Sequence, residues 1–115
     1  MSAPTSAVDT AHYTYRVSWS AEDSEFVATC LELPSLSWLA GTQTKALSGL
    51  RKVVDGLVAD LAANHEEIPI PLAERRFSGR FNIRISPDLH RELAVKAADH
   101  GMSLNRFVSD RLARD

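Results

Sequence analysis

The sequence predicts an α+β protein built from two modules, and three observations lead to this prediction. Three short runs that read as strands precede one long helical pattern in the first half. The last third reads as one short strand followed by two helices. The charge also differs along the chain: residues 1–74 carry four Lys+Arg against ten Asp+Glu, whereas residues 75–115 carry nine against five. We therefore expect an acidic module joined to one that tolerates phosphate.

The first elements are two strands joined by a short turn. Residues 1–12 are mostly small or polar, which predicts a disordered tail. Residues 13–19 alternate, with Tyr13, Tyr15, Val17 and Trp19 on one side, as in a half-buried strand. A polar turn at residues 20–24 leads to a second strand over residues 25–33, and Pro34 ends it. The pair predicts a hairpin.

A short strand and a long helix complete the first module. Residues 36–40 predict the third strand. Thr42 or Thr44 then caps a helix that runs to about residue 63. Its apolar positions recur at helical spacing and form one stripe that would lie on the sheet: Leu47, Leu50, Val54, Leu57, Val58 and Leu61. We expect one domain over residues 13–64, followed by a linker over residues 65–78 whose Ile-Pro-Ile-Pro-Leu run favours an extended path.

The second module, residues 79–115, begins with a strict alternation. Arg80, Asn82 and Arg84 fall on one face of a strand and the apolar residues between them on the other. Ser86 is placed to cap a helix that starts at Pro87. Gly101 supplies a left-handed residue that ends this helix, and Ser103 caps the next. Strand, helix, helix is the order expected here.

One strand of seven residues can neither satisfy its own backbone nor bury its own apolar face, so this module needs a second copy. Two identical strands would pair antiparallel around a two-fold axis. This is the ribbon-helix-helix pattern of DNA-binding dimers, and we expect a homodimer or a higher homo-oligomer. The predicted dimer core comprises Phe81, Ile83, Ile85, Leu89, Leu93, Leu104, Phe107 and Val108.

The polar face of the ribbon predicts contact with operator DNA. Arginine pairs with guanine edges and asparagine with adenine edges in the major groove, which is wide enough for a two-stranded ribbon. Arg80, Asn82 and Arg84 are therefore the candidate base-reading residues. The start of the second helix offers free backbone N–H groups to a phosphate, at Ser103, Leu104, Asn105 and Arg106. The alternative is an ordinary solvated face on an edge strand.

Catalysis is not expected. The acidic residues of the first module are scattered over turns and a helix surface, whereas a two-metal nuclease needs carboxylates that converge. No histidine has metal-ligand spacing with another histidine or with Cys30, which we read as a buried core residue. We therefore predict a protein that is not an enzyme and holds no metal or cofactor. The absence of a signal peptide or a long apolar run predicts a cytoplasmic protein without membrane contact.

Two parts of the chain resemble the HicB antitoxin family. Residues 13–19, Tyr-Thr-Tyr-Arg-Val-Ser-Trp, with residues 26–37 and Gly-Thr-Gln-Thr-Lys-Ala-Leu at 41–47, look like the N-terminal domain of these proteins. Residues 77–90, with Gly-Met-Ser-Leu-Asn at 101–105, look like the ribbon-helix-helix that ends many of them. The turn Glu22-Asp23-Ser24-Glu25 departs from the Asp-Gly that the family often has, which predicts a differently shaped loop.

This resemblance implies a division of labour. The first module would be a partial ribonuclease-H-like domain without nuclease activity that blocks a small RNA-cleaving HicA toxin. The second would repress the shared operon. An acidic domain suits a basic RNA-binding partner and a basic one suits DNA. Two other readings stay open: a stand-alone repressor whose first module senses a ligand or adds oligomer contacts, and a nuclease.

Overall fold

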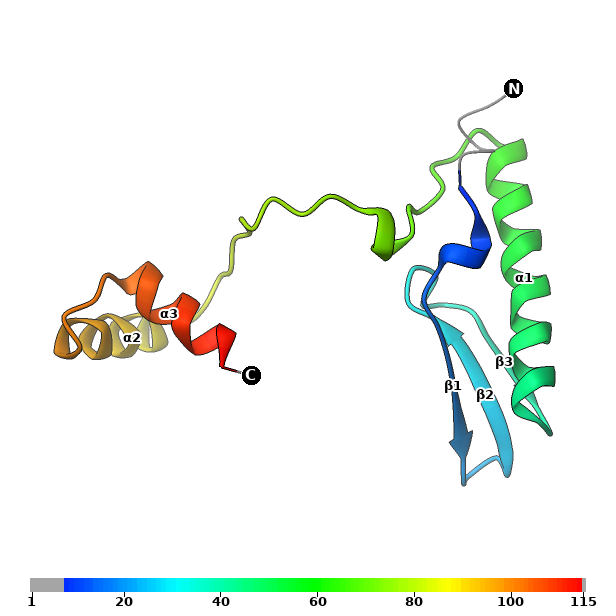
Figure 1. Cartoon of the computed structure of the whole chain (residues 1–115), viewed down its shortest axis with the longest axis horizontal. Helices are drawn as coiled ribbons and strands as arrows, with labels where there is room; N and C mark the ends of the chain where they lie inside the picture. Colours follow the sequence, from blue (N-terminus) through cyan, green and yellow to red (C-terminus); the bar gives the residue numbers. More distant parts are fainter. Residues whose placement is uncertain (1–7, 115) are drawn as a thin grey trace. The chain divides into compact units, whose positions relative to one another are not determined.

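The computed structural model describes residues 8–114, and the chain divides into two compact units. The first ends at Phe77 and the second begins at Ser78. Figure 1 shows the elements of both. In chain order they are the 3₁₀ helix η2 (Thr10–His12), the strands β1 (Tyr15–Ser20), β2 (Glu25–Cys30) and β3 (Ser37–Ala40), the helix α1 (Gln43–Ala63), the 3₁₀ helix η3 (Leu72–Glu74), and the helices α2 (Pro87–Asp99) and α3 (Leu104–Ala113). The α+β class predicted from the sequence is confirmed.

The three strands of the first unit form one antiparallel sheet in the order β1-β2-β3. Trp19 on β1 lies opposite Phe26 on β2, and Phe26 lies opposite Ala40 on β3. The rings of Trp19 and Phe26 meet edge to face, with centroids 5.1 Å apart. The predicted hairpin turn contains Ser24 with φ 52°, a left-handed conformation that L residues seldom adopt.

Helix α1 packs against all three strands and buries one face of the sheet (Figure 1). Thr42 is the N-cap, and its hydroxyl accepts a hydrogen bond from the Lys45 backbone N–H at 3.1 Å. The predicted stripe is confirmed at its centre, where Leu50 and Val54 are fully buried. They join a core to which the sheet contributes Ala28 and Cys30. The expected buried position of Cys30 is thus confirmed.

The structure differs from the predicted tail at residues 8–12. Val8 packs against the core, and the Thr10 hydroxyl donates to the Asp55 carboxylate at 2.6 Å. The Tyr15 hydroxyl donates to the Thr10 carbonyl at 2.8 Å. These contacts hold η2 against α1 and β1. They could not be predicted from the composition of so short a segment, because their partners lie elsewhere in the chain. The rest of the predicted tail, residues 1–7, lies outside the described residues.

The predicted linker over residues 65–78 is partly held by the first unit. We call residues 69–75 the strap. The Tyr13 hydroxyl donates to the Pro69 carbonyl at 2.7 Å, and the Leu72 backbone N–H donates to the Glu32 carboxylate at 2.9 Å. Pro71 is fully buried. The strap therefore belongs to the first unit, and the connection between the units is shorter than the sequence suggests.

The second unit is a pair of packed helices preceded by a segment without assigned secondary structure. Ser86 caps α2 and Ser103 caps α3, each through a side-chain bond to a backbone N–H. Gly101, with φ +64°, follows α2, as predicted. Residues 79–85 are not paired as a strand within the single chain. A ladder at these positions requires a second strand.

Candidate nucleic-acid interface

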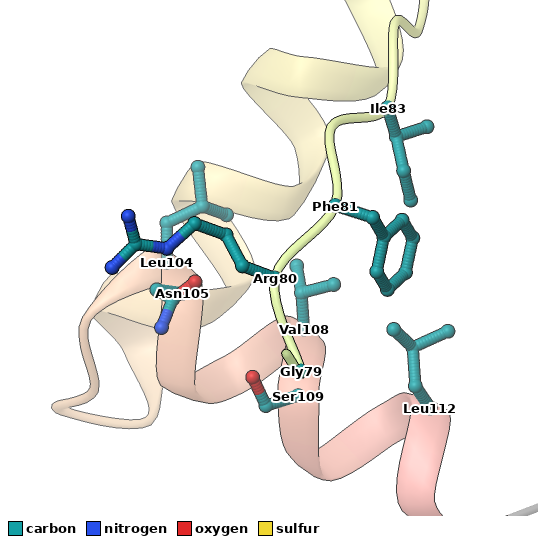
Figure 2. Close-up of a pocket in the computed structure, with 9 residues that line it drawn as sticks. All are labelled: Gly79, Arg80, Phe81, Ile83, Leu104, Asn105, Val108, Ser109 and Leu112. Carbon is teal, nitrogen blue, oxygen red and sulfur yellow. The ribbon is translucent and has the colours of Figure 1, made fainter. Parts of the chain in front are cut away.

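The segment that was predicted to read DNA starts at a tight turn. The Arg80 backbone N–H donates to the Ser78 hydroxyl oxygen at 3.1 Å. Between them, Gly79 adopts φ +84°, a conformation in which a side chain would be strained. Because of this turn, residues 80–83 run alongside α3, as Figure 2 shows.

A groove of about 480 Å³ lies between this segment and α3. Its walls come from Gly79, Arg80, Phe81 and Ile83 on one side and from Leu104, Asn105, Val108, Ser109 and Leu112 on α3. The α3 residues recur three or four positions apart, so they share one face of the helix. The groove therefore joins the predicted ribbon to the second helix within a single chain.

The two sides of the segment carry different chemistry. In Figure 2 the Arg80 side chain extends over the first turn of α3 toward Asn105. Phe81 and Ile83 point away from it, to the side on which Leu112 lies. A guanidinium beside an amide at a helix start can offer hydrogen-bond donors to a nucleic acid. The apolar side chains on the opposite side have no hydrogen-bond donors, and they are suited to pack against an apolar protein surface.

The other predicted DNA-binding residues are exposed or engaged locally. Asn82, Arg84 and Arg106 are exposed and do not line the groove. The Ser103 hydroxyl accepts a hydrogen bond from the Arg106 backbone N–H at 3.1 Å, as a helix cap does. Leu104 is half-buried in the groove wall. Leu104 can therefore contact an anion only through its backbone N–H, because its side chain faces the groove.

The predicted dimer-core residues fall into two sets. Phe107 is only 4% exposed in the single chain, where its ring lies beside His100 and under the Arg111 guanidinium. By contrast, Phe81 is 71% and Ile83 60% exposed. The remaining members are Ile85 and Leu89, which are exposed, and Leu93, Leu104 and Val108, which are half-buried. Phe107 thus belongs to the core of the unit itself, while the strand residues have their apolar surface free.

Leu112 belongs with this exposed apolar group, although it was not among the predicted dimer-core residues. It is 57% exposed and lines the groove four positions after Val108. Helical periodicity already places it on the inner face of α3. That it lines a groove depends on the Ser78–Gly79 turn, which brings residues 80–83 alongside α3 and which the periodicity of the helix does not encode.

The first unit contains a buried carboxyl group, that of Glu32, which is 8% exposed. Burial raises the pKa of this carboxyl, but hydrogen bonds from the backbone of Leu72 and Thr14 and from the Thr14 hydroxyl outweigh burial. The pKa of Glu32 therefore lies below its ordinary value. Burial also raises the pKa of the Cys30 thiol, so this cysteine is held as the neutral thiol.

Two further features are absent from the residues that the structure describes. Within residues 8–114, no group of three or more His, Cys, Asp or Glu side chains is placed to hold a metal ion. Over the same residues, no helix combines the length and apolar character needed to cross a membrane.

In a comparison with protein families, residues 61–112 match the model of the HicB family. This region comprises the end of α1, the strap, the segment of residues 79–85 that we call the groove segment, the whole of α2 and most of α3. Over these residues the chain is similar to the HicB family. No curated protein and no solved structure matches the chain.

Proposed function

We propose that this protein is an antitoxin of a type II toxin–antitoxin system that acts in the cytoplasm. Its first unit neutralises a HicA-type ribonuclease toxin, and its second unit represses the operon by binding operator DNA. The first unit is a partial ribonuclease-H-like domain that has no catalytic role. The observation that carries the proposal is the HicB-family match over residues 61–112 together with the groove inside it.

The DNA-binding part is supported by the separation of polar and apolar side chains about the groove segment. Pairing of two segments as a ribbon in a homodimer would cover Phe81 and Ile83, which are exposed in the single chain. It would leave Arg80, Asn82 and Arg84 on the opposite face, where a two-stranded ribbon meets base edges. The start of α3 lies beside Arg80 and would meet the phosphate backbone. This arrangement is a ribbon-helix-helix dimer.

The need for a second copy is supported by the small core of the second unit. Among its described residues, only Ala97 and Phe107 are buried. An isolated unit of this size exposes too much apolar surface to be stable on its own. Dimerisation removes that surface from water and contributes roughly 25 cal/mol for each Å² of apolar area buried.

The toxin-binding part is supported by the charge of the first unit. Residues 1–77, which form the first unit, carry ten carboxylates against six cationic side chains. A protein that cleaves RNA has to attract a polyanion and is expected to be basic. An acidic domain would therefore associate with it rapidly and would compete with its substrate.

The test combines growth and DNA binding. The reading frame next to this gene is expressed in a host with and without this chain, and growth is recorded. Gel shifts then measure binding to the DNA upstream of the two genes. We expect growth arrest by the neighbouring product alone, rescue by co-expression, and a shift on the upstream DNA. A neighbouring product that is harmless, or that stays toxic beside this chain, contradicts the antitoxin role.

A stand-alone repressor is the second candidate function, and one observation favours it. The family match begins at residue 61 and leaves the sheet and most of α1 outside it. In that case the second unit would still bind DNA, and the first would sense a ligand or add oligomer contacts. The same experiment separates the two, since a stand-alone repressor would give the gel shift without any rescue of growth.

A further inference from the structure

One face of the sheet in the first unit is not covered by α1. Side chains alternate along the strands, and the core takes Tyr15 and Val17 from β1 and Phe26 and Ala28 from β2. The residues between them point to the opposite side. We call this side the open face and define it by Arg16, Ser18, Val27, Thr29 and Leu39.

The register shows how the open face is built. Val27 lies at its centre, opposite Ser18 on β1 and Leu39 on β3. In the next row Thr29 lies opposite Arg16 and Ser37. Antiparallel sheets that face water usually carry polar residues on that side. Here Leu39 is 38% exposed and Val27 half-buried, so the middle of the open face is apolar.

The charges of the unit are distributed unequally between its two sides. Helix α1 carries the cations Lys45, Arg51 and Lys52 against the carboxylates of Asp55 and Asp60. Three carboxylates occur where β1 turns into β2, at Glu22, Asp23 and Glu25. Glu25 is two residues from Val27 on the same strand, so it borders the open face. The open face thus has an apolar centre, one cation at Arg16, and three carboxylates at its border, so negative charge predominates there.

We propose that the open face is the docking surface for a cationic protein, the RNA-cleaving toxin of the proposed function on which this inference rests. A basic surface is complementary to the three carboxylates at its border, which outnumber the single cation Arg16. On α1, by contrast, three cations outnumber two carboxylates. A second copy of this unit is a poorer occupant, because it would bring the same carboxylates. The apolar row of Val27 and Leu39 provides the water-excluding centre that such an interface needs.

The test introduces a positive charge on each side of the unit in the full-length chain. Ser18→Lys and Thr29→Lys alter the open face. Ser48→Lys and Thr44→Lys are matched controls on exposed positions of α1. Calorimetry with the purified product of the neighbouring reading frame measures the affinity, circular dichroism checks folding, and gel shifts on the upstream DNA check the second unit. Ser18 is exposed, so its substitution is tolerated even if Thr29→Lys unfolds the sheet.

We expect the open-face variants to weaken toxin binding by about tenfold or more and the α1 variants by less than about twofold, with operator binding unchanged in all four. If Ser18→Lys leaves the affinity for the toxin unchanged, or if the open-face and α1 variants lose equal affinity, the open face is not the docking surface. An altered mass of the chain alone in sedimentation, with toxin affinity intact, would assign the open face to a contact between copies. Absence of binding by the unaltered chain would reject the proposed function itself, and the inference with it.

Discussion

The carboxylate of Glu32 accepts a hydrogen bond from the backbone N–H of Leu72 at 2.9 Å, across 40 positions of sequence. The same carboxylate accepts bonds from the backbone N–H and the hydroxyl of Thr14. One buried side chain therefore ties the entry to β1 and the strap to the end of β2. This makes the strap part of the first unit, although its sequence reads as a linker.

Glu32→Gln should loosen the strap and destabilise the first unit. The amide keeps the shape of the side chain but replaces one accepting oxygen with a donor, which leaves buried N–H groups without a partner. The expected cost is about 1–3 kcal/mol in the free energy of unfolding. Urea denaturation followed by tryptophan fluorescence measures it, because both tryptophans belong to the first unit. Glu67→Gln, at an exposed position, is the control and should change little.

The same residue predicts a pH dependence. The pKa of Glu32 in the folded chain lies below the ordinary value of 4.5, so the ionised carboxylate is favoured by folding. Its contribution is therefore fully present above pH 4.5 and is lost as the pH falls through the folded-state pKa. Glu32→Gln should lose less stability on acidification than the unaltered chain. Equal acid sensitivity in both would show that other carboxyls dominate.

Gly49 and Gly56 predict opposite results for the same substitution in α1. An alanine Cβ at Gly49 would overlap the indole ring of Trp38, whereas nothing lies within 4 Å of one at Gly56. Gly56→Ala should stabilise the helix by about 0.5–1 kcal/mol. Gly49→Ala should lose that gain and displace Trp38, seen as a shifted emission in a Trp19→Phe background. Equal stabilisation by both substitutions would mean that the indole moves without cost.

The sequence predicts local elements well because their signals are local. Ser86 and Ser103 cap the helices where they were expected to, and Thr42 is one of the two caps predicted for α1, since each cap depends on a side chain that bonds to its own first helical turn. The strap and η2 were missed because both depend on partners far away in the chain. Proline-rich composition suggests an extended path but cannot show what that path packs against.

In the candidate interface, too, the local pattern was predicted from the sequence, whereas contacts between distant residues were not. Alternation in residues 80–85 separates polar from apolar positions without knowledge of the fold. The approach of Arg80 to Asn105 requires the Gly79 turn and the packing of the segment along α3. Phe107 was assigned to the dimer core by periodicity, which cannot distinguish an apolar face buried within one unit from a face left for a partner.

Ile83→Lys should abolish dimerisation and, with it, DNA binding. Ile83 is exposed in the single chain and would lie at the centre of the paired ribbon, where an unpaired charge costs several kcal/mol. Sedimentation equilibrium measures the mass and gel shifts the binding. Val95→Lys, at an exposed position of α2 that does not line the groove, is the control. A compact Ile83→Lys dimer that still binds DNA would refute the ribbon.

Arg80→Ala, Asn82→Ala and Arg84→Ala should each weaken operator binding by about 1–3 kcal/mol and relax sequence preference, with the dimer intact. Gel shifts on operator and on unrelated DNA of the same length separate the two effects. Arg91→Ala removes an exposed arginine from α2 and serves as the matched control. Equal losses on both DNAs in the three strand variants would reassign these side chains to phosphate contacts.

Fragments should show where the first unit ends. A fragment of residues 1–77 keeps the strap, whereas one of residues 1–67 lacks Pro69, Pro71 and Leu72 and leaves the Tyr13 hydroxyl and the Glu32 carboxylate without those partners. We expect the shorter fragment to unfold at a lower urea concentration, by an amount that corresponds to several kcal/mol, because it loses buried hydrogen bonds and the buried Pro71 together.

The fragments also separate the two activities. Residues 1–77 and residues 1–67 should both lack operator binding, and a fragment of residues 76–115 should dimerise and bind the operator by itself. In cells that express the neighbouring product, residues 1–77 should restore growth, residues 1–67 should do so less well, and residues 76–115 should not. Rescue by residues 76–115 alone would place the inhibitory surface in the second unit. Equal stability of residues 1–77 and residues 1–67 would show that the strap does not stabilise the first unit.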